Sequence, residues 1–249
     1  PMYQWEGLVS YWCRIRIQDS NRFTLNRNDM KKNKILAGLV AMLPFVTSCD
    51  NHTFEDYSWH SWAPGMVYCT NGDVVTYEKC MADGNVPEAV LFYVDKNDET
   101  SGIAYAVSLK EYEGKAFSDP DTTYFVQGTS ANIVQYDGET NTTSLRYNQI
   151  ASPLAKSVNP KYYVPSVAEM YRLYVARDVV NTTISKCNGD VLPINNESCW
   201  YWTSTECEDA QTDRAWRYSL YSGRFESADK HFEYPFRPIM LIRLNNAEK

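Results

Sequence analysis

Alternating apolar and polar positions predict a β-rich domain from about residue 64 onward. Met66–Cys69 and Val74–Tyr77 flank the polar segment Thr70–Asp73, and an Asn-Gly pair between two extended runs is typical of a β-hairpin. Two longer apolar, β-branched runs follow at Ala89–Val94 and Ile103–Leu109. Runs of this length and composition predict two further strands.

The clearest helix in the chain begins after Ser166. Ser166 stands at the N-cap position with Glu169 three residues later, which is the capping-box pattern. Apolar residues then recur at helical spacing as far as about Val180, and these are Val167, Met170, Leu173, Tyr174 and Ala176. We expect the apolar side of this helix to pack on a sheet.

The C-terminal sequence returns to strands. Four runs have strand character, joined by turns such as Tyr221-Ser222-Gly223: Trp200–Thr205, Ala215–Leu220, Arg224–Ser227 and Arg237–Leu244. The intervening residues 111–160 are rich in Gly, Asp, Asn, Thr and Ser, which predicts long surface loops with one short helix near Thr143–Ile150. Strands combined with one long helix predict the α+β class.

A secretory signal lies inside the chain. Met30–Lys34 is basic, Ile35–Val46 is an apolar run too short to span a bilayer, and Val46-Thr47-Ser48 leads to Cys49. The segment resembles a bacterial lipobox, which implies that the Cys49 thiol is acylated and becomes the new N-terminus. Several acyl chains on one residue anchor a protein stably. The alternative is a buried helix that ends in Cys.

This signal divides the sequence into four parts. Residues 30–48 form the lipoprotein signal peptide, 49–63 a polar and aromatic tether, and 64–249 the folded domain. A signal peptide acts from the N-terminus, so we interpret the Arg-rich residues 1–29 as upstream translation that is not part of the mature protein. The expected location is the cell envelope, at the outer membrane, with the membrane contacted through the lipid anchor.

The charge is unevenly distributed between these parts. The whole chain carries a formal charge of −7, but residues 1–48 hold seven Lys or Arg against three Asp or Glu. Their net charge of +4 leaves −11 for the remainder. Because so acidic a domain repels phosphate backbones, nucleic acid is excluded as an expected partner.

The cysteines and histidines provide no predicted metal site. His52, His60 and His231 are scattered, and neither C-x-x-C nor H-E-x-x-H spacing occurs. Apart from Cys13 and Cys49, five cysteines remain, of which Cys69–Cys80 and Cys199–Cys207 could close short disulfide loops. Free buried thiols are the equal alternative. We expect no cofactor.

Several C-terminal segments match a known pattern in order and approximate spacing. They are Val164-Pro165-Ser166 with Glu169-Met170, Tyr201-Trp202-Thr203-Ser204-Thr205-Glu206, Ala215-Trp216, Gly223, and Phe236-Arg237-Pro238-Ile239. Upstream, Gly65-Met66-Val67-Tyr68 and Val90–Val94 extend the match to residues 64–244. The chain resembles the C-type-lectin-like major-paralogue domains of lipoproteins from Bacteroides-type gut bacteria. The same fold group includes retroelement-diversified variable proteins and formylglycine-generating enzymes.

The resemblance implies a C-type-lectin-like fold with a small twisted antiparallel sheet, one or two helices and long loops, whose terminal strands pair. Trp202 and Trp216 then suit core positions, and Arg237 can pair with a carboxylate such as Glu206. These motif residues, with Thr203, Ser204 and Pro238, are then expected to hold the fold rather than touch a ligand. The calcium-binding loops of sugar-binding lectins do not occur in this sequence, so "lectin" describes the fold alone.

The binding surface is then expected between the motifs, in Cys207–Arg214 and Arg217–Tyr234, where polar and aromatic residues alternate. Tyr and Arg combine contact area with directed hydrogen bonds and are enriched at binding hot spots. The candidate ligand-binding residues are Arg214, Arg217, Tyr218, Tyr221, Arg224, Phe225, Glu226 and His231. A solvated loop is the alternative for each of them. The resemblance also raises the sub-hypothesis that this stretch is diversified by a retroelement.

Three functions compete at this point. The favoured one is a non-enzymatic binding or adhesion module for an unidentified protein or glycan. The second is a formylglycine-generating-like enzyme with a reactive cysteine pair, for which Cys199 and Cys207 are the nearest candidates. The third is a pilus or surface-layer component that donates a terminal strand to a neighbour. We predict no catalytic residue, because no G-x-S-x-G motif or activated thiol is evident.

Overall fold

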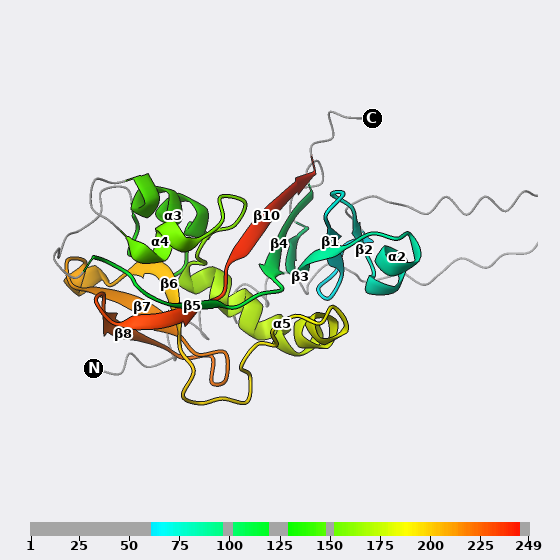
Figure 1. Cartoon of the computed structure of the whole chain (residues 1–249). Coiled ribbons are helices and arrows are strands. Elements are labelled where there is room, and N and C mark those ends of the chain that lie inside the picture. Colours follow the sequence, from blue (N-terminus) through cyan, green and yellow to red (C-terminus); the bar gives the residue numbers. More distant parts are fainter. Residues whose placement is uncertain (1–60, 97–101, 120–128, 148–151, 245–249) are drawn as a thin grey trace, which may run out of the picture. The chain divides into compact units, whose positions relative to one another are not determined.

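The computed structural model describes residues 61–96, 102–119, 129–147 and 152–244. All of them belong to one compact unit of the chain. This part combines three antiparallel sheets with a few helices, so the predicted α+β class is confirmed (Figure 1). None of its helices has the length and hydropathy needed to span a membrane. The proposed lipid site Cys49, the signal peptide and residues 1–29 lie outside the described residues.

The largest sheet has five strands in the order β10-β4-β3-β1-β2. They are β1 (Val67–Cys69), β2 (Val74–Val75), β3 (Pro87–Asp95), β4 (Gly102–Ser108) and β10 (Ile239–Leu244). The predicted hairpin is confirmed, because β1 and β2 pair antiparallel around Gly72, whose φ is 95°. The two predicted long strands are β3 and β4.

Two smaller sheets carry the rest of the strands. One pairs β5 (Tyr112–Ala116) with β9 (Glu233–Phe236), and the other has the order β6-β7-β8. Its strands are β6 (Tyr201–Glu206), β7 (Arg214–Tyr218) and β8 (Phe225–Asp229). The β7–β8 turn is closed by hydrogen bonds from Gly223 N to Ser219 O and from Ser219 N to Arg224 O, both 2.8 Å long.

Helix α5 (Val167–Lys186) begins with the predicted capping box. Ser166 Oγ accepts from Glu169 N, and the Glu169 carboxylate accepts from Ser166 N at 2.7 Å. The helix packs on β3 of the large sheet and on β6 and β7 of the three-stranded sheet. The shorter helices are α2 (Tyr77–Ala82), α3 (Gly138–Tyr147), α4 (Pro153–Ser157) and the 3-10 turn η2 (Glu208–Ala210).

Two apolar clusters hold these elements together. One joins Trp202 with Phe117, Leu145 and Leu154, so it ties β6 to the segment after β5 and to α3 and α4. The other lies along α5 and includes Met170, Leu173 and Val180 among many side chains. The predicted core position of Trp202 is confirmed. Trp216 is only half-buried and packs at the margin of the second cluster.

The structure corrects several predicted details. The terminal strands do not pair, because β3 and β4 lie between β1 and β10. Trp62, assigned to the tether, is only 5% exposed and packs in the core, so the domain begins earlier than predicted. Glu206 does not pair with Arg237, whose Nε donates to Ser108 O at 3.0 Å. Glu206 instead pairs with Lys230 at 2.6 Å.

The described parts of the stretch 111–160, residues 111–119, 129–147 and 152–160, hold more regular secondary structure than their composition predicted. Strand β5 and helix α4 were both missed, and the helix predicted near Thr143–Ile150 is α3, which begins at Gly138. Strand β9 was missed as well. Each of β5 and β9 is short, and its partner lies more than a hundred residues away along the chain, so no local pattern indicates the pairing.

Candidate ligand-binding surface

The predicted binding residues divide between the two sides of the β6-β7-β8 sheet. Arg217 lies opposite both Trp202 and Glu226, whereas Tyr218 lies opposite Tyr201 and Phe225. Cross-strand partners point to the same side of a sheet, and consecutive residues point to opposite sides. Arg217 and Glu226 therefore share one side, while Tyr218 and Phe225 share the other.

Arg217 is the centre of the first side. Its guanidinium lies over the rings of Trp200 and Tyr234, at 4.6 and 4.9 Å from their centroids. Nη1 donates to Tyr234 Oη at 2.6 Å, and Nη2 donates to Glu226 Oε2 at 3.1 Å. These contacts hold a partly exposed arginine in one geometry before any ligand arrives, which lowers the entropy cost of binding.

A second arginine increases the positive charge at this place. Arg224 Nη2 lies 3.6 Å from Glu226 Oε1, so the single carboxylate of Glu226 faces two guanidinium groups. The side chain of Arg224 is 52% exposed and that of Arg217 is 22% exposed. The three groups together carry a net charge of +1, and Arg224 is the more exposed of the two cations.

Aromatic rings continue the surface beyond Arg217. Phe232 is 58% exposed and meets Tyr234 edge-on, with 6.5 Å between ring centroids. Tyr234 in turn rests edge-on against the buried Trp202 at 5.0 Å. We name this set the Arg217 strip and define it as Trp200, Arg217, Arg224, Glu226, Phe232 and Tyr234.

The strip is supported from the core. Trp202 Nε1 donates to Lys115 O at 3.0 Å and to Phe232 O at 3.3 Å, which fixes the backbone under the exposed ring of Phe232. Lys230, between β8 and β9, forms a buried ion pair with Glu206 and also donates to Gln211 O. A charge removed from water requires such partners, so this ion pair constrains the β8–β9 connection.

Tyr218 is a correction to the predicted binding set. It is only 1% exposed, and its ring lies on the α5 side of the sheet, 6.5 Å from the Tyr174 ring centroid. Phe225 is half-buried beside it and contacts Trp216 edge-on at 5.1 Å. Burial raises the pKa of the Tyr218 hydroxyl well above its usual range. Its side chain therefore packs in the core and offers no contact to a ligand at the surface.

The other predicted residues lie apart from the Arg217 strip or are used within the sheet. Arg214 donates to Ser227 through Nε at 3.0 Å and through Nη2 at 2.8 Å. Tyr221 is 43% exposed in the β7–β8 turn. His231 lies 2.9 Å from Asp229 through Nδ1. Of the eight predicted residues, the structure brings Arg217, Arg224 and Glu226 together in the strip.

Sequence reasoning missed the aromatic members of the strip. Trp200 was interpreted only as the start of a strand, and neither Phe232 nor Tyr234 was selected, although both fall in the stretch expected to bind. The sequence signal that could have indicated these residues was the density of aromatic residues close to Arg217 and Arg224. Their assembly depends on the pairing of β9 with β5, which the sequence pattern did not show.

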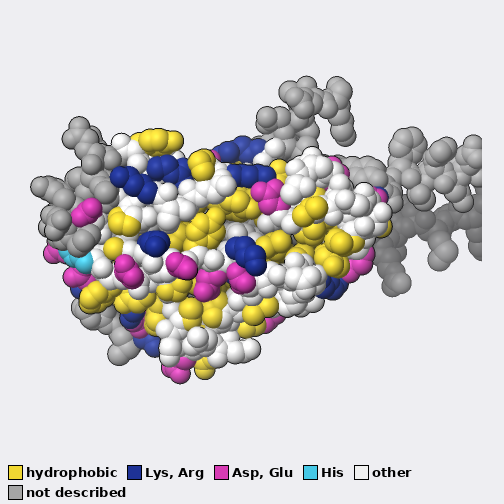
Figure 2. All heavy atoms as spheres, in the orientation of Figure 1, with side chains coloured by type: hydrophobic (Ala, Val, Ile, Leu, Met, Phe, Trp, Pro, Cys, Tyr) yellow, Lys and Arg dark blue, Asp and Glu magenta, His cyan; other side chains and the backbone are white. Residues whose placement is uncertain are grey.

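The molecular surface carries both charge signs. Figure 2 shows basic, acidic and hydrophobic side chains interspersed over one face, without a continuous field of one sign. An alternating surface of this kind gives little long-range attraction for a polyanion. Recognition at the strip is then expected to depend on short-range fit.

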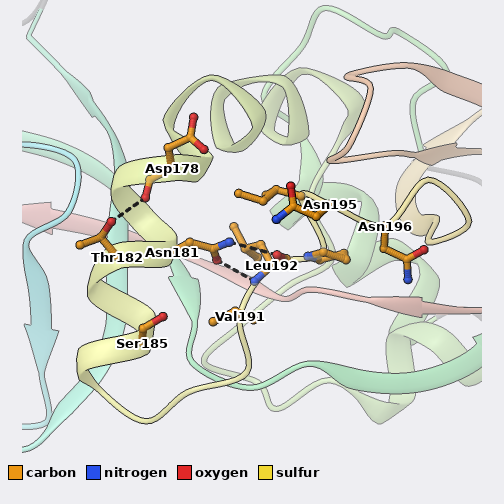
Figure 3. Close-up of a pocket in the computed structure, with 10 residues that line it drawn as sticks. Asp178, Asn181, Thr182, Ser185, Val191, Leu192, Asn195 and Asn196 are labelled. Carbon is orange, nitrogen blue, oxygen red and sulfur yellow. Dashed lines mark hydrogen bonds between the residues drawn. The ribbon is translucent and has the colours of Figure 1, made fainter.

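A separate open hollow lies between the C-terminal half of α5 and residues 191–196 (Figure 3). It has a volume of about 640 Å³, and its lining combines polar side chains such as Thr182 and Asn196 with apolar residues such as Val191 and Ile194. The Asn181 amide holds its two walls together, donating to Leu192 O at 3.0 Å and accepting from Leu192 N at 2.7 Å. No residue predicted to bind a ligand lines this hollow.

The cysteines considered for catalysis are not close together. Cys199 precedes β6 and Cys207 follows it, and an extended strand of six residues separates its ends by about 17 Å. A disulfide needs Cα atoms within about 7 Å, so Cys199–Cys207 is wrong as a disulfide candidate and cannot act as a cysteine pair. Burial raises the pKa of the Cys207 thiol to about 12 and that of Cys199 to about 11. Within the described ranges, no group of three or more His, Cys, Asp or Glu is arranged to hold a metal.

Comparisons with known proteins identify no family for this chain. Neither the protein-family models nor the curated proteins that were searched give a match. The candidate surface is therefore judged on its geometry.

Proposed function

We propose that this protein is a cell-envelope lipoprotein whose domain binds a protein or glycan ligand through the Arg217 strip. The domain performs no catalysis in this account. Its fold is the C-type-lectin-like one, with the lipid on Cys49 holding it at the outer membrane. The resemblance described for residues 64–244 motivates the fold and the location.

One observation carries the binding proposal: an arginine lies between two aromatic rings at the surface of a rigid sheet. Trp, Tyr and Arg dominate the binding energy of interfaces, because they give large contact areas and directed donors at low conformational cost. Arg217 is held by Tyr234 and Glu226, and exposed Arg224 and Phe232 lie at its margins. Aromatic faces with adjacent polar donors suit either a sugar ring or a polar peptide.

Three features support the C-type-lectin-like fold. The sheets are small and antiparallel, a helix capped by Ser166 packs between them, and the Trp202 motif occupies the core. Against these stands the separation of β1 from β10 by two strands, which departs from the terminal pairing that the resemblance implies. An experimental structure of residues 61–244 that lacks the small antiparallel sheets, or that does not place Trp202 in their core, would contradict the proposed fold.

The lipid anchor is tested by metabolic labelling in a bacterial host. Cells that express the chain from Met30 are grown with an alkyne-bearing fatty acid, and the protein is then coupled to a fluorophore. We expect the wild-type chain to be labelled and Cys49→Ser to lose the label. In the full-length chain Cys13→Ser is the control, and it should be labelled as strongly as the wild type. Equal labelling of Cys49→Ser would exclude this residue as the lipid site.

The binding function is tested on glycan and protein arrays. We expect at least one ligand to be retained by the wild-type protein and to be weakened at least tenfold in Arg224→Ala/Phe232→Ala. Both side chains are more than half exposed, so the substitutions should leave the core intact. Tyr147→Ala is the matched control, because Tyr147 is 77% exposed on α3 and lies outside the strip. Unchanged binding of every ligand by the double variant would contradict the proposal.

A further inference from the structure

Three cysteines from different elements meet at the second apolar cluster. Cys69 lies on β1, Cys80 on α2, and Cys187 caps the C-terminus of α5. Cys69 and Cys80 both lie in this cluster, and Cys187 packs against it. Burial raises the pKa of the Cys69 thiol, and the nearby Cys80 adds to the rise. All three cysteines carry free thiols in the structure, and Cys69 and Cys80 are fully buried, whereas Cys187 is half-buried.

The backbone holds Cys69 and Cys80 beside each other. The chain leaves α2 through a hydrogen bond from Asn85 N to Cys80 O at 2.9 Å. It then returns along β1, where Thr70 N donates to Val86 O at 2.9 Å and Pro87 lies opposite Cys69. Residues 69 and 80 are thus positioned by a closed loop of main-chain contacts rather than by side-chain rotation alone.

We propose that Cys69 and Cys80 form a disulfide bond that ties the β1–β2 hairpin to α2. The two thiols lose two protons and two electrons, and a sulfur–sulfur bond forms between them. The oxidant is a disulfide donor, such as a small-molecule disulfide or a protein dithiol oxidase, which is reduced to two thiols as its own bond breaks. The bond closes the chain segment that runs from Cys69, the last residue of β1, through β2 to Cys80 in α2.

Burial determines when this reaction takes place. Removal from water raises the pKa of the Cys69 thiol to about 12, so the reactive thiolate is scarce in the folded domain. The exchange therefore proceeds during folding, before the cluster closes around the two sulfurs. Once formed, the bond is shielded from external reductants, because neither cysteine is exposed.

The linkage is tested by oxidative refolding of the full chain with Cys13→Ser and Cys49→Ser. The reduced, denatured protein is refolded in a glutathione redox buffer, its free thiols are alkylated, and it is digested with trypsin without reduction. Cleavage after Lys79 separates the two cysteines, so a disulfide appears as a linked peptide pair in mass spectrometry. We expect the Cys69–Cys80 pair as the main product. Five alkylated cysteines, or a main Cys80–Cys187 linkage, would overturn the proposal.

Thermal unfolding provides an independent readout. We expect the oxidised chain to unfold at a temperature roughly 5 °C or more above that of the chain refolded under reducing conditions. Cys199→Ser in the same background should keep this difference, because Cys199 takes no part in the bond. Cys69→Ser/Cys80→Ser should lose it. If Cys69→Ser/Cys80→Ser shows the same difference in unfolding temperature between oxidised and reduced protein, the Cys69–Cys80 bond is not its cause and the proposal is overturned.

Discussion

At the scale of single residues, Glu169 belongs to a capping box whose carboxyl group is buried in the folded protein, which makes its ionised form unfavourable. The carboxyl group is almost fully buried at the start of α5, where it accepts from Ser166 N and from Tyr163 Oη at 3.1 Å. Burial raises its pKa from 4.5 to about 7, and the nearby Asp137 adds to the rise. The capping box was evident in the sequence, but the burial of its carboxyl was not, because that depends on α3 and the segment before α5.

The raised pKa of Glu169 makes a specific prediction for pH dependence. The unfolded chain releases this proton near pH 4.5 and the folded chain near pH 7, so the free energy of unfolding should fall as the pH rises through that interval. The contribution is about 3 kcal/mol. In Glu169→Gln the amide oxygen can still accept from Ser166 N while the amide NH2 donates to Tyr163 Oη, and the substitution should remove this component. Denaturant unfolding from pH 4.5 to pH 8 measures it, and parallel curves for the two proteins would show that Glu169 does not titrate in this range.

Gly223 is required by both its backbone angle and its neighbour. Its φ is 71°, and an added Cβ would lie 2.7 Å from the Tyr174 ring. We expect Gly223→Ala to lower the free energy of unfolding by about 2–4 kcal/mol. Gly84→Ala is the control, because Gly84 has φ 72° with open space around its Cβ position, and it should cost about 1–2 kcal/mol. If denaturant unfolding shows the same loss of free energy of unfolding in both variants, the contact with Tyr174 does not contribute to the cost of Gly223→Ala.

At the scale of elements, the sequence predicted strands and helices best where one segment carries its own signal. The hairpin at Gly72 and the start of α5 follow from turn and capping residues, which act locally. The helix end was placed near Val180, but α5 continues to Lys186. The polar residues after Val180 are weak helix formers, yet Thr183 Oγ1 donates to Gly65 O at 2.8 Å and Ile184 packs in the core. Tertiary contacts therefore extend the helix beyond its local pattern.

The cap of α5 gives a prediction at this scale. Ser166 Oγ accepts from Glu169 N and donates to Gln135 O at 2.8 Å, and the residue is fully buried. We expect Ser166→Ala to cost about 2 kcal/mol, since it leaves a helix N–H and a carbonyl unpaired. Thr76→Ala, which removes the exposed cap of α2, should cost less than half as much. Denaturant unfolding of both variants decides this, and a smaller loss for Ser166→Ala would contradict the importance of the α5 cap.

At the scale of the whole molecule, the sequence indicated the stretch that carries the candidate surface but not its members. Tyr and Arg content pointed to Cys207–Arg214 and Arg217–Tyr234, and the alternation of side chains along β7 then divided the candidates. Arg217 and Glu226 lie together on one side of the sheet and are partly exposed, whereas Tyr218 faces α5. The choice between these sides is set by strand register and by what covers each side of the sheet. Neither can be inferred from composition, which is why Tyr218 was placed wrongly and Trp200 was overlooked.

The most direct test of the account is the affinity of Arg217→Ala for a ligand identified on the arrays. Isothermal titration calorimetry should show binding weakened about thirtyfold or more relative to wild type, as expected for a central hot-spot residue. Tyr147→Ala should bind within twofold of wild type, and circular dichroism should show that both variants are folded. If folded Arg217→Ala binds as tightly as the wild-type protein, the Arg217 strip is not the recognition surface.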